Sequence, residues 1–132
     1  MSNKLEVVGG NGKKYATEIP YLEEEVRIGT WFGKPLYRKC HRLEGTALSS
    51  GMNSINVGNN FLPNIKQLVR ADIRPDYTSS GNYNPPLYNS GGNLKQMNIA
   101  YVTNHGYTIY VNESWGSSYK YTSIFEYTKT TD

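Results

Sequence analysis

Side chains suited to binding a sugar occur in one long loop and two later turns of this sequence. A saccharide presents apolar C–H faces flanked by hydroxyl groups, and a flat aromatic ring beside an amide or hydroxyl group is complementary to both. Rings, amides and one imidazole of this kind occur in a loop predicted at residues 76–93 and in the two turns that follow it. We predict that the ligand-binding residues are Tyr83, Asn84, Tyr88, Asn89, Asn104, His105 and Trp115.

Each of these aromatic residues also has a purely structural interpretation. Trp is enriched at protein interfaces, so Trp115 in the turn ESWGSS can instead cap the core or lie between subunits. The Pro85-Pro86 dipeptide can clamp the rings of Tyr83 and Tyr88 onto a sheet. An up-and-down order of strands does not require the loop and the turns to share one end of the fold, so the sequence leaves both interpretations open.

The residue types that carry catalysis form no recognisable pattern. His41 and His105 are far apart in the sequence, and neither accompanies a nucleophile elbow, a pair of carboxylates or an HExxH motif. Asp72 and Asp76 lack the spacing of a calcium loop. Cys40 is the only cysteine, so the sequence has no intrachain disulfide and no cysteine metal cluster. We expect no catalytic residues, no metal and no cofactor, and hence no enzyme.

The composition fits one small domain that is poor in aliphatic residues. Of the 132 residues 37% are hydrophobic, and that share includes 12 Tyr. We expect an N-terminal arm or linker at residues 1–17 and one domain at residues 18–132. The net charge of +3 comes without a dense basic stripe, so nucleic-acid binding is not indicated. No apolar run has the length of a membrane span or the character of a signal peptide.

Strands must position the loop and the turns, because apolar residues recur with a period of two. Residues 26–32 and 36–43 predict a hairpin around Gly33-Lys34-Pro35. Residues 65–73 predict a half-buried strand whose outer face carries Arg70, Asp72 and Arg74. In residues 36–43 the two faces of the predicted strand are about equally polar, so the sequence does not decide which of them points inward. The two faces carry Leu36, Arg38, Cys40 and Arg42 on one side and Tyr37, Lys39, His41 and Leu43 on the other.

The last part of the chain predicts three more strands in a meander. The first of them places Met97, Ile99 and Tyr101 on one face. Strands and turns that alternate about every 8–12 residues, without a helical period, are typical of an antiparallel sandwich or barrel. The tyrosines of these strands are expected to fill the core or an interface between subunits; they are Tyr101, Tyr107, Tyr119, Tyr121 and Tyr127. The tyrosines of the long loop are expected to lie where a ligand binds; they are Tyr77, Tyr83 and Tyr88.

Three motifs resemble a known family. EEVRIGTWFGKPLYRK at residues 24–39, SSGNYNPPLY at residues 79–88 and EYTKTTD at residues 126–132 are similar to the C-terminal receptor-binding or head domain of tail-fibre-like proteins from phages and prophages of gut Firmicutes. In that family a hairpin of this pattern opens a β-sandwich and the YTKTTD motif closes it. Phe32 stands where the family has an acidic or polar residue before the turn glycine.

The resemblance implies an antiparallel, jelly-roll-like β-sandwich head domain that forms a homotrimer on a phage tail and attaches to a host surface polysaccharide without cleaving it. The expected partners are that polysaccharide and other tail proteins. The expected location is the virion tail, after synthesis in the bacterial cytoplasm without a signal peptide. The alternative is a structural protein of the tail or fibre tip that has no host ligand. Nucleic-acid binding and membrane insertion are not expected.

Overall fold

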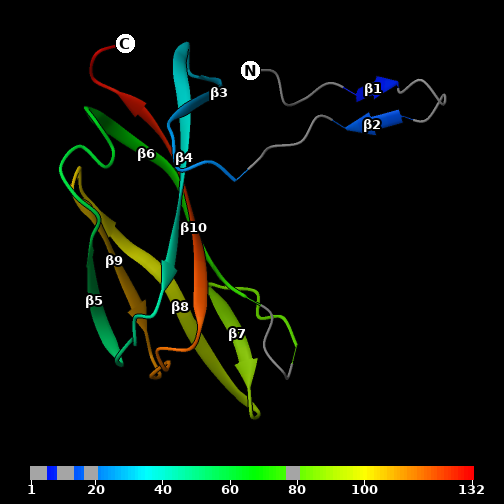
Figure 1. Ribbon diagram of the computed structural model, residues 1–132, viewed down its shortest axis with the longest axis vertical. Coiled ribbons are helices and arrows are strands. Elements are labelled where there is room, and N and C mark those ends of the chain that lie inside the picture. Colours follow the sequence, from blue (N-terminus) through cyan, green and yellow to red (C-terminus); the bar gives the residue numbers. More distant parts are fainter. Residues whose placement is uncertain (1–5, 9–13, 17–20, 77–80) are drawn as a thin grey trace.

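The period-two segments of the sequence form the strands of two antiparallel sheets, which pack face to face (Figure 1). The computed structural model describes residues 6–8, 14–16, 21–76 and 81–132, and every regular element within them is a β-strand. The predicted all-β, antiparallel β-sandwich is therefore confirmed. Its finer description as jelly-roll-like stays a prediction.

Sheet I and sheet II each contain four strands. Sheet I has the order β3 (Val26–Trp31), β4 (Lys34–Glu44), β10 (Lys120–Lys129), β6 (Ile65–Pro75). Sheet II has the order β5 (Gly51–Asn56), β9 (Gly106–Val111), β8 (Asn93–Val102), β7 (Leu87–Ser90). Two short strands in the predicted arm, β1 (Glu6–Val8) and β2 (Lys14–Ala16), pair with each other, while residues 1–5, 9–13 and 17–20 lie outside the described part of the chain.

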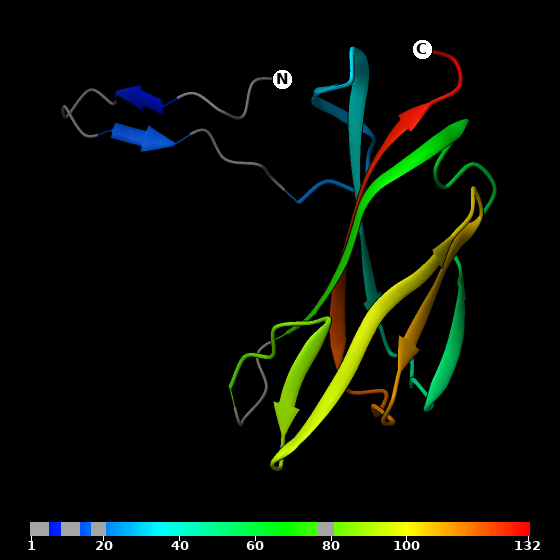
Figure 2. The same cartoon turned by 180° about the vertical axis from the view of Figure 1, so that it is seen from behind.

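Sheet I extends beyond sheet II at the end where β3 and the tip of the β3–β4 hairpin lie (Figures 1 and 2). The predicted hairpin is present, but the prediction that Gly33-Lys34-Pro35 forms its turn is wrong. The turn consists of Phe32 and Gly33, with φ of 48° and 79°, whereas Lys34 and Pro35 already belong to β4 and pair with Trp31 and Thr30. Positive φ at both central positions is the geometry that matches the twist of two antiparallel strands. Glycine or residues with short polar side chains normally occupy these two turn positions, so the bulky Phe32 is an outlier there.

Two predictions about chain order are wrong. The closing strands do not form a meander, because β9 belongs to sheet II whereas β10 inserts between β4 and β6 in sheet I, so residues 112–119 cross from one sheet to the other. The segment 76–93 is not wholly irregular, because it contains β7, which pairs with β8 across Gly91 and Gly92. Tyr77, predicted in that segment, lies outside the described residues.

The packing of the two sheets decides which face of β4 points inward. His41 and Leu43 face sheet II, where the His41 Nδ1 atom lies 2.7 Å from the Tyr107 hydroxyl oxygen. Lys39 faces the same way, and its Nζ atom donates to the Phe61 carbonyl oxygen at 2.6 Å. The arginines of β4 point to the opposite face, where acidic partners from other segments lie. The alternation in β6 is confirmed between Arg70 and Ile73, because Ile73 is buried and Arg70 and Asp72 form an ion pair on the outer face. It does not hold nearer the start of the strand, because a register shift against β10 places Leu68, which strict alternation would turn outward, opposite the buried Tyr127.

Tyrosine does supply much of the core, as the shortage of aliphatic residues suggests. Tyr107, Tyr121 and Tyr127 are buried, and the Tyr127 hydroxyl donates to the carboxylate of Glu25, which also binds Lys129. Burial and this hydrogen bond raise the pKa of Tyr127 above its ordinary value. Tyr101 instead lies on the surface with 66% of its area exposed.

Candidate functional site

The outer face of sheet II, the side turned away from sheet I, carries no charged side chain on its four strands. Two rows of directly paired residues cross this face: Tyr101, Thr108 and Ser54 in one, and Asn98, Tyr110 and Met52 in the next. Lys95 is the sole Lys, Arg, Asp or Glu in the four strands. It pairs with the buried Tyr88 and contacts Glu113 at 3.8 Å, so it belongs to the inner side.

A β-bulge in β8 brings Tyr101 to this outer face. Ile99 pairs with Ile109, but the next pair is Tyr101 with Thr108, so Ala100 and Tyr101 together lie opposite one residue. The extra residue reverses the alternation, and a side chain expected beside Met97 and Ile99 points to solvent. The prediction that Tyr101 shares the face of Met97 and Ile99 is therefore wrong. Bulges of this kind often re-aim a side chain beside a functional site.

The exposed Tyr101 ring forms one side of a concavity of about 610 Å³. It lies at the end of sheet II where the turn between β8 and β9 meets residues 57–60. Hydroxyl and amide side chains line much of the rest, together with His105. The polar and aromatic lining residues are Ser54, Asn56, Asn59, Tyr101, Thr103, His105, Tyr107 and Thr108.

Backbone hydrogen bonds hold the two walls of this concavity together. The amides of Val57 and Gly58 both donate to the His105 carbonyl oxygen, at 2.9 and 3.0 Å. The Thr103 hydroxyl oxygen accepts hydrogen bonds from the amides of His105 and Gly106, at 3.1 and 3.2 Å. The turn and the facing loop are therefore joined at several points, and the concavity is formed before a ligand arrives, as is usual for small-molecule sites.

The other predicted aromatic residues meet at the opposite end of the sandwich. Tyr83 stacks on Tyr88 with ring centroids 4.6 Å apart, and both rings contact Trp115 edge-on. Tyr88 and Trp115 are each 5% exposed, so their faces are covered by one another and by the core. The Tyr88 hydroxyl donates to Glu113 at 2.8 Å, and burial together with this bond raises the pKa of Tyr88. These two rings leave little surface for a ligand.

The structure thus divides the predicted binding residues between two ends. One group contains Tyr83, Asn84, Tyr88, Asn89 and Trp115, because Tyr83 and Tyr88 contact Trp115 and the two asparagines follow them directly in the chain. The strand β7 and the crossing segment 112–119 lie at this end of the sandwich (Figure 1). Asn84 and Asn89 are exposed there, and the Asn89 side chain accepts a hydrogen bond from Gly92. Asn104 and His105 lie at the β8–β9 turn, where His105 lines the concavity and the Asn104 carbonyl oxygen accepts from Phe61.

Sequence reasoning missed most of the concavity. Ser54, Asn56 and Thr108 lie on strand faces that carry no recognisable motif, and the sequence alternation predicts the wrong face for Tyr101. The adjacent Ala100 and Tyr101 interrupt a strict alternation of apolar and polar residues. A single sequence does not show whether such an interruption forms a β-bulge, or in which strand. The pairing with β9 is what makes the bulge visible.

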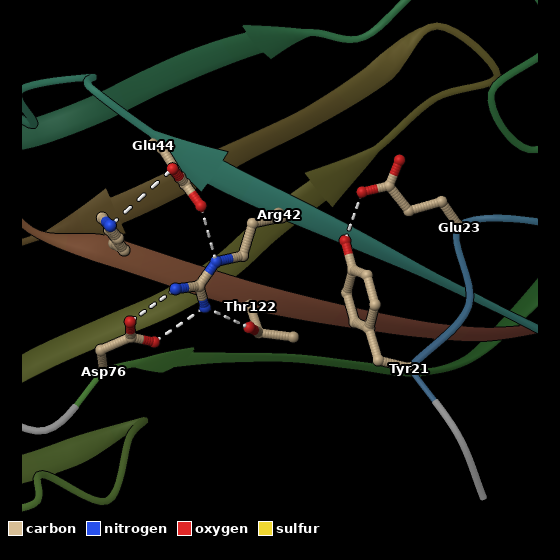
Figure 3. Close-up of polar contacts among 7 residues, drawn as sticks. Tyr21, Glu23, Arg42, Glu44, Asp76 and Thr122 are labelled. Carbon is tan, nitrogen blue, oxygen red and sulfur yellow. Dashed lines mark hydrogen bonds and ion pairs between the residues drawn. The ribbon is translucent and has the colours of Figure 1, made fainter.

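A cluster of charged residues lies on the outer face of sheet I, and its members are paired with one another (Figure 3). Arg42 donates from two nitrogens to the carboxylate of Asp76, at 2.8 and 2.5 Å, and its other contacts are Glu44 and Thr122. The Arg42 guanidinium lowers the pKa of Asp76. Tyr21 and Glu23 border a concavity of about 510 Å³ beside this cluster. Since the donors of Arg42 already have acidic partners, the cluster is suited to stabilising the sheet rather than to capturing an anion.

His41 is the histidine that lies between the sheets. Burial lowers its pKa, and burial also raises the pKa of its partner Tyr107 to about 12. Ser123 stands directly opposite His41 in the register of β4 and β10, but it is fully buried. A substrate cannot reach a serine in that position, so the His41–Ser123 pair is part of the core.

Among the described residues, no group of three or more His, Cys, Asp or Glu side chains is placed to hold a metal ion. The same part of the chain contains no helix long and apolar enough to cross a membrane.

Comparison of the chain with models of known protein families, with curated proteins and with solved structures finds no match.

Proposed function

We propose that this chain is a non-catalytic attachment domain that binds a host cell-surface glycan, of the kind found in the phage and prophage tail-fibre proteins that its motifs resemble. In that setting it works at the virion tail, beside other tail proteins and as a homotrimer. The observation that supports glycan binding is the uncharged concavity beside Tyr101, with hydroxyl and amide side chains around an exposed ring.

The chemistry of this concavity matches a sugar better than other small ligands. The Tyr101 ring offers a flat surface to C–H groups, while Ser54, Asn56 and Thr108 offer donors and acceptors to hydroxyl groups. A phosphate or carboxylate ligand would require a cation, and His105 is the sole ionisable lining residue apart from tyrosines. A lipid or other apolar ligand would leave the polar lining without partners.

Replacing Tyr101 with alanine is expected to weaken binding of the domain to host cells by about tenfold, which corresponds to ~1.4 kcal/mol. The side chain is 66% exposed, so the free energy of unfolding should change by no more than about 0.5 kcal/mol. A host-cell pull-down with labelled protein measures the affinity, and thermal unfolding checks the fold. Tyr21→Ala is the matched control, because Tyr21 is 45% exposed and lies beside sheet I. Equal binding by the Tyr101→Ala variant and the wild type would remove the concavity from the site.

A structural role in tail or fibre-tip assembly is the second candidate, and the tip of the β3–β4 hairpin favours it. Phe32 is 91% exposed, stands in the left-handed conformation and contacts Trp31 edge-on at 5.3 Å. Holding a bulky residue in that conformation costs roughly 1–2 kcal/mol. A large apolar side chain kept at a strained, protruding position is a candidate anchor for another protein chain.

Phe32→Asn is expected to raise the free energy of unfolding by about 1 kcal/mol, because asparagine tolerates the left-handed conformation of this turn. Denaturant unfolding measures this change, and light scattering measures the mass of both proteins. If Phe32 anchors an assembly, the variant will be more stable yet smaller in mass than the wild type. An unchanged mass would count against the assembly role of this tip.

A further inference from the structure

The two outer faces of the sandwich differ sharply in charge. Sheet I carries ion pairs across three strands, among them Arg38–Glu126 at 3.3 Å and Arg70–Asp72 at 2.5 Å. The outer face of sheet II carries amide, hydroxyl, aromatic and aliphatic side chains instead, and its strands place no Lys, Arg, Asp or Glu on it. An exposed sheet face without charges is unusual for a surface that faces only water.

The uncharged surface continues from the concavity toward β7. The next row on this face, toward the start of β8, pairs Asn98 with the half-buried Tyr110. The row after that pairs Gln96 with the exposed Leu87 of β7. Neighbouring strands are about 4.8 Å apart, and diagonal neighbours on one face are about 7–8 Å apart. The path from Tyr101 over Tyr110 to Leu87 is therefore longer than a single sugar ring.

We propose that the ligand is an uncharged polysaccharide, bound as an extended chain that starts in the concavity at Tyr101 and runs over Tyr110 toward β7. This inference rests on the glycan-binding function proposed above and adds the class of glycan and the direction of the chain. Each step along the face offers a flat or apolar group beside an amide, such as Tyr110 beside Asn98.

The absence of charge argues against an anionic polysaccharide. Carboxylate and phosphate groups lose their hydration at a protein surface, and lysine or arginine side chains normally compensate them. The four strands of sheet II place no such side chain on their outer face, whereas Arg38, Arg42 and Arg70 of sheet I are paired with carboxylates. A neutral chain of hydroxyl groups and C–H faces meets no such penalty, and its binding does not depend on attraction between charges.

The test uses the full chain in native gels that contain mannan, dextran or arabinogalactan as neutral polymers, and alginate or wall teichoic acid as anionic ones. We expect retardation by at least one neutral polymer, with no more than a twofold change between about 0.05 M and about 0.5 M NaCl. Retardation by the anionic polymers alone, weakened strongly by salt, would overturn the proposal while leaving glycan binding intact.

The path over the sheet is tested by ligand length. With oligosaccharides cut from the neutral polymer that binds, Tyr110→Ala should weaken binding of the longest fragments by roughly fivefold and of the disaccharide by less than twofold, whereas Tyr101→Ala should weaken both. Asn98→Ala serves as a second variant of the same row. Equal effects of Tyr110→Ala on short and long fragments, or no effect on either, would overturn the extended path.

Two further outcomes separate this inference from the proposed function. If neither host cells nor any polymer is bound and Tyr101→Ala changes nothing, the glycan-binding function itself fails. If Tyr110→Ala lowers the mass of the protein in light scattering, the face is an interface between copies of the chain, and the extended ligand path is overturned.

Discussion

Replacing Trp115 with alanine is expected to lower the free energy of unfolding by about 3–5 kcal/mol, the usual cost of removing a buried tryptophan. The side chain is 5% exposed, and its ring contacts four tyrosines that come from three segments of the chain. Its backbone also pairs with Leu48 in both directions, at 2.8 and 2.9 Å. The four rings around it are Tyr83, Tyr88, Tyr119 and Tyr121.

This expectation changes the meaning of a binding experiment on Trp115. From the sequence, a loss of binding after Trp115→Ala would identify a ligand contact, but the structure predicts a loss of stability that reduces binding indirectly. Urea unfolding of the Trp115→Ala and Trp115→Phe variants separates the two effects, because phenylalanine refills part of the volume and should recover part of the stability. If Trp115→Ala keeps the stability of the wild type and still loses host binding, Trp115 contacts the ligand and its assignment to the core is wrong.

Gly106→Ala is expected to destabilise the protein by about 3 kcal/mol, at the upper end of what overpacking costs. A Cβ atom at Gly106 would lie 1.9 Å from the carbonyl oxygen of Ile55, which is backbone and has no rotamer to change. The β5–β9 pair, in which Gly106 lies opposite Asn56, must then separate. Because the same strands carry Ser54, Asn56 and Thr108, glycan binding should fall together with stability.

Gly29→Ala is the matched control for this prediction. Gly29 also lies in a strand, β3, but a Cβ atom there meets nothing within 4 Å, so the free energy of unfolding should change by less than about 0.5 kcal/mol. Thermal unfolding of the two variants measures the difference. A Gly106→Ala protein as stable as the Gly29→Ala protein would contradict the close approach of β5 and β9.

Local patterns were enough to predict much of the fold. The alternation of Ala71 and Ile73 with Arg70 and Asp72 describes one strand with one buried face, and the structure confirms it. The hairpin was predictable for the same reason, since a glycine that permits positive φ separates two strand-like segments. Such features depend on neighbours within a few residues, and a single sequence contains that information.

The candidate site was only partly predictable, because its residues come together through long-range pairing. The position of His105 in a turn predicts an exposed side chain, and His105 does line the concavity. Trp115 in a turn and Tyr88 in the predicted loop are expected to be exposed in the same way, yet they are buried against one another. A turn residue is exposed or buried according to which other segment packs on it, and no local pattern describes that segment.

The sequence by itself determined that this protein is an antiparallel, all-β chain whose tyrosines replace missing aliphatic residues. Only the tertiary structure decided which face of β4 points inward, that β10 joins sheet I, and that Tyr101 points to solvent. The physical reason is the same in each case. Strand formation and alternation follow from the side chains along one segment, whereas the choice between two equally polar faces, and the position of a bulge, follow from contacts with strands far away in the chain.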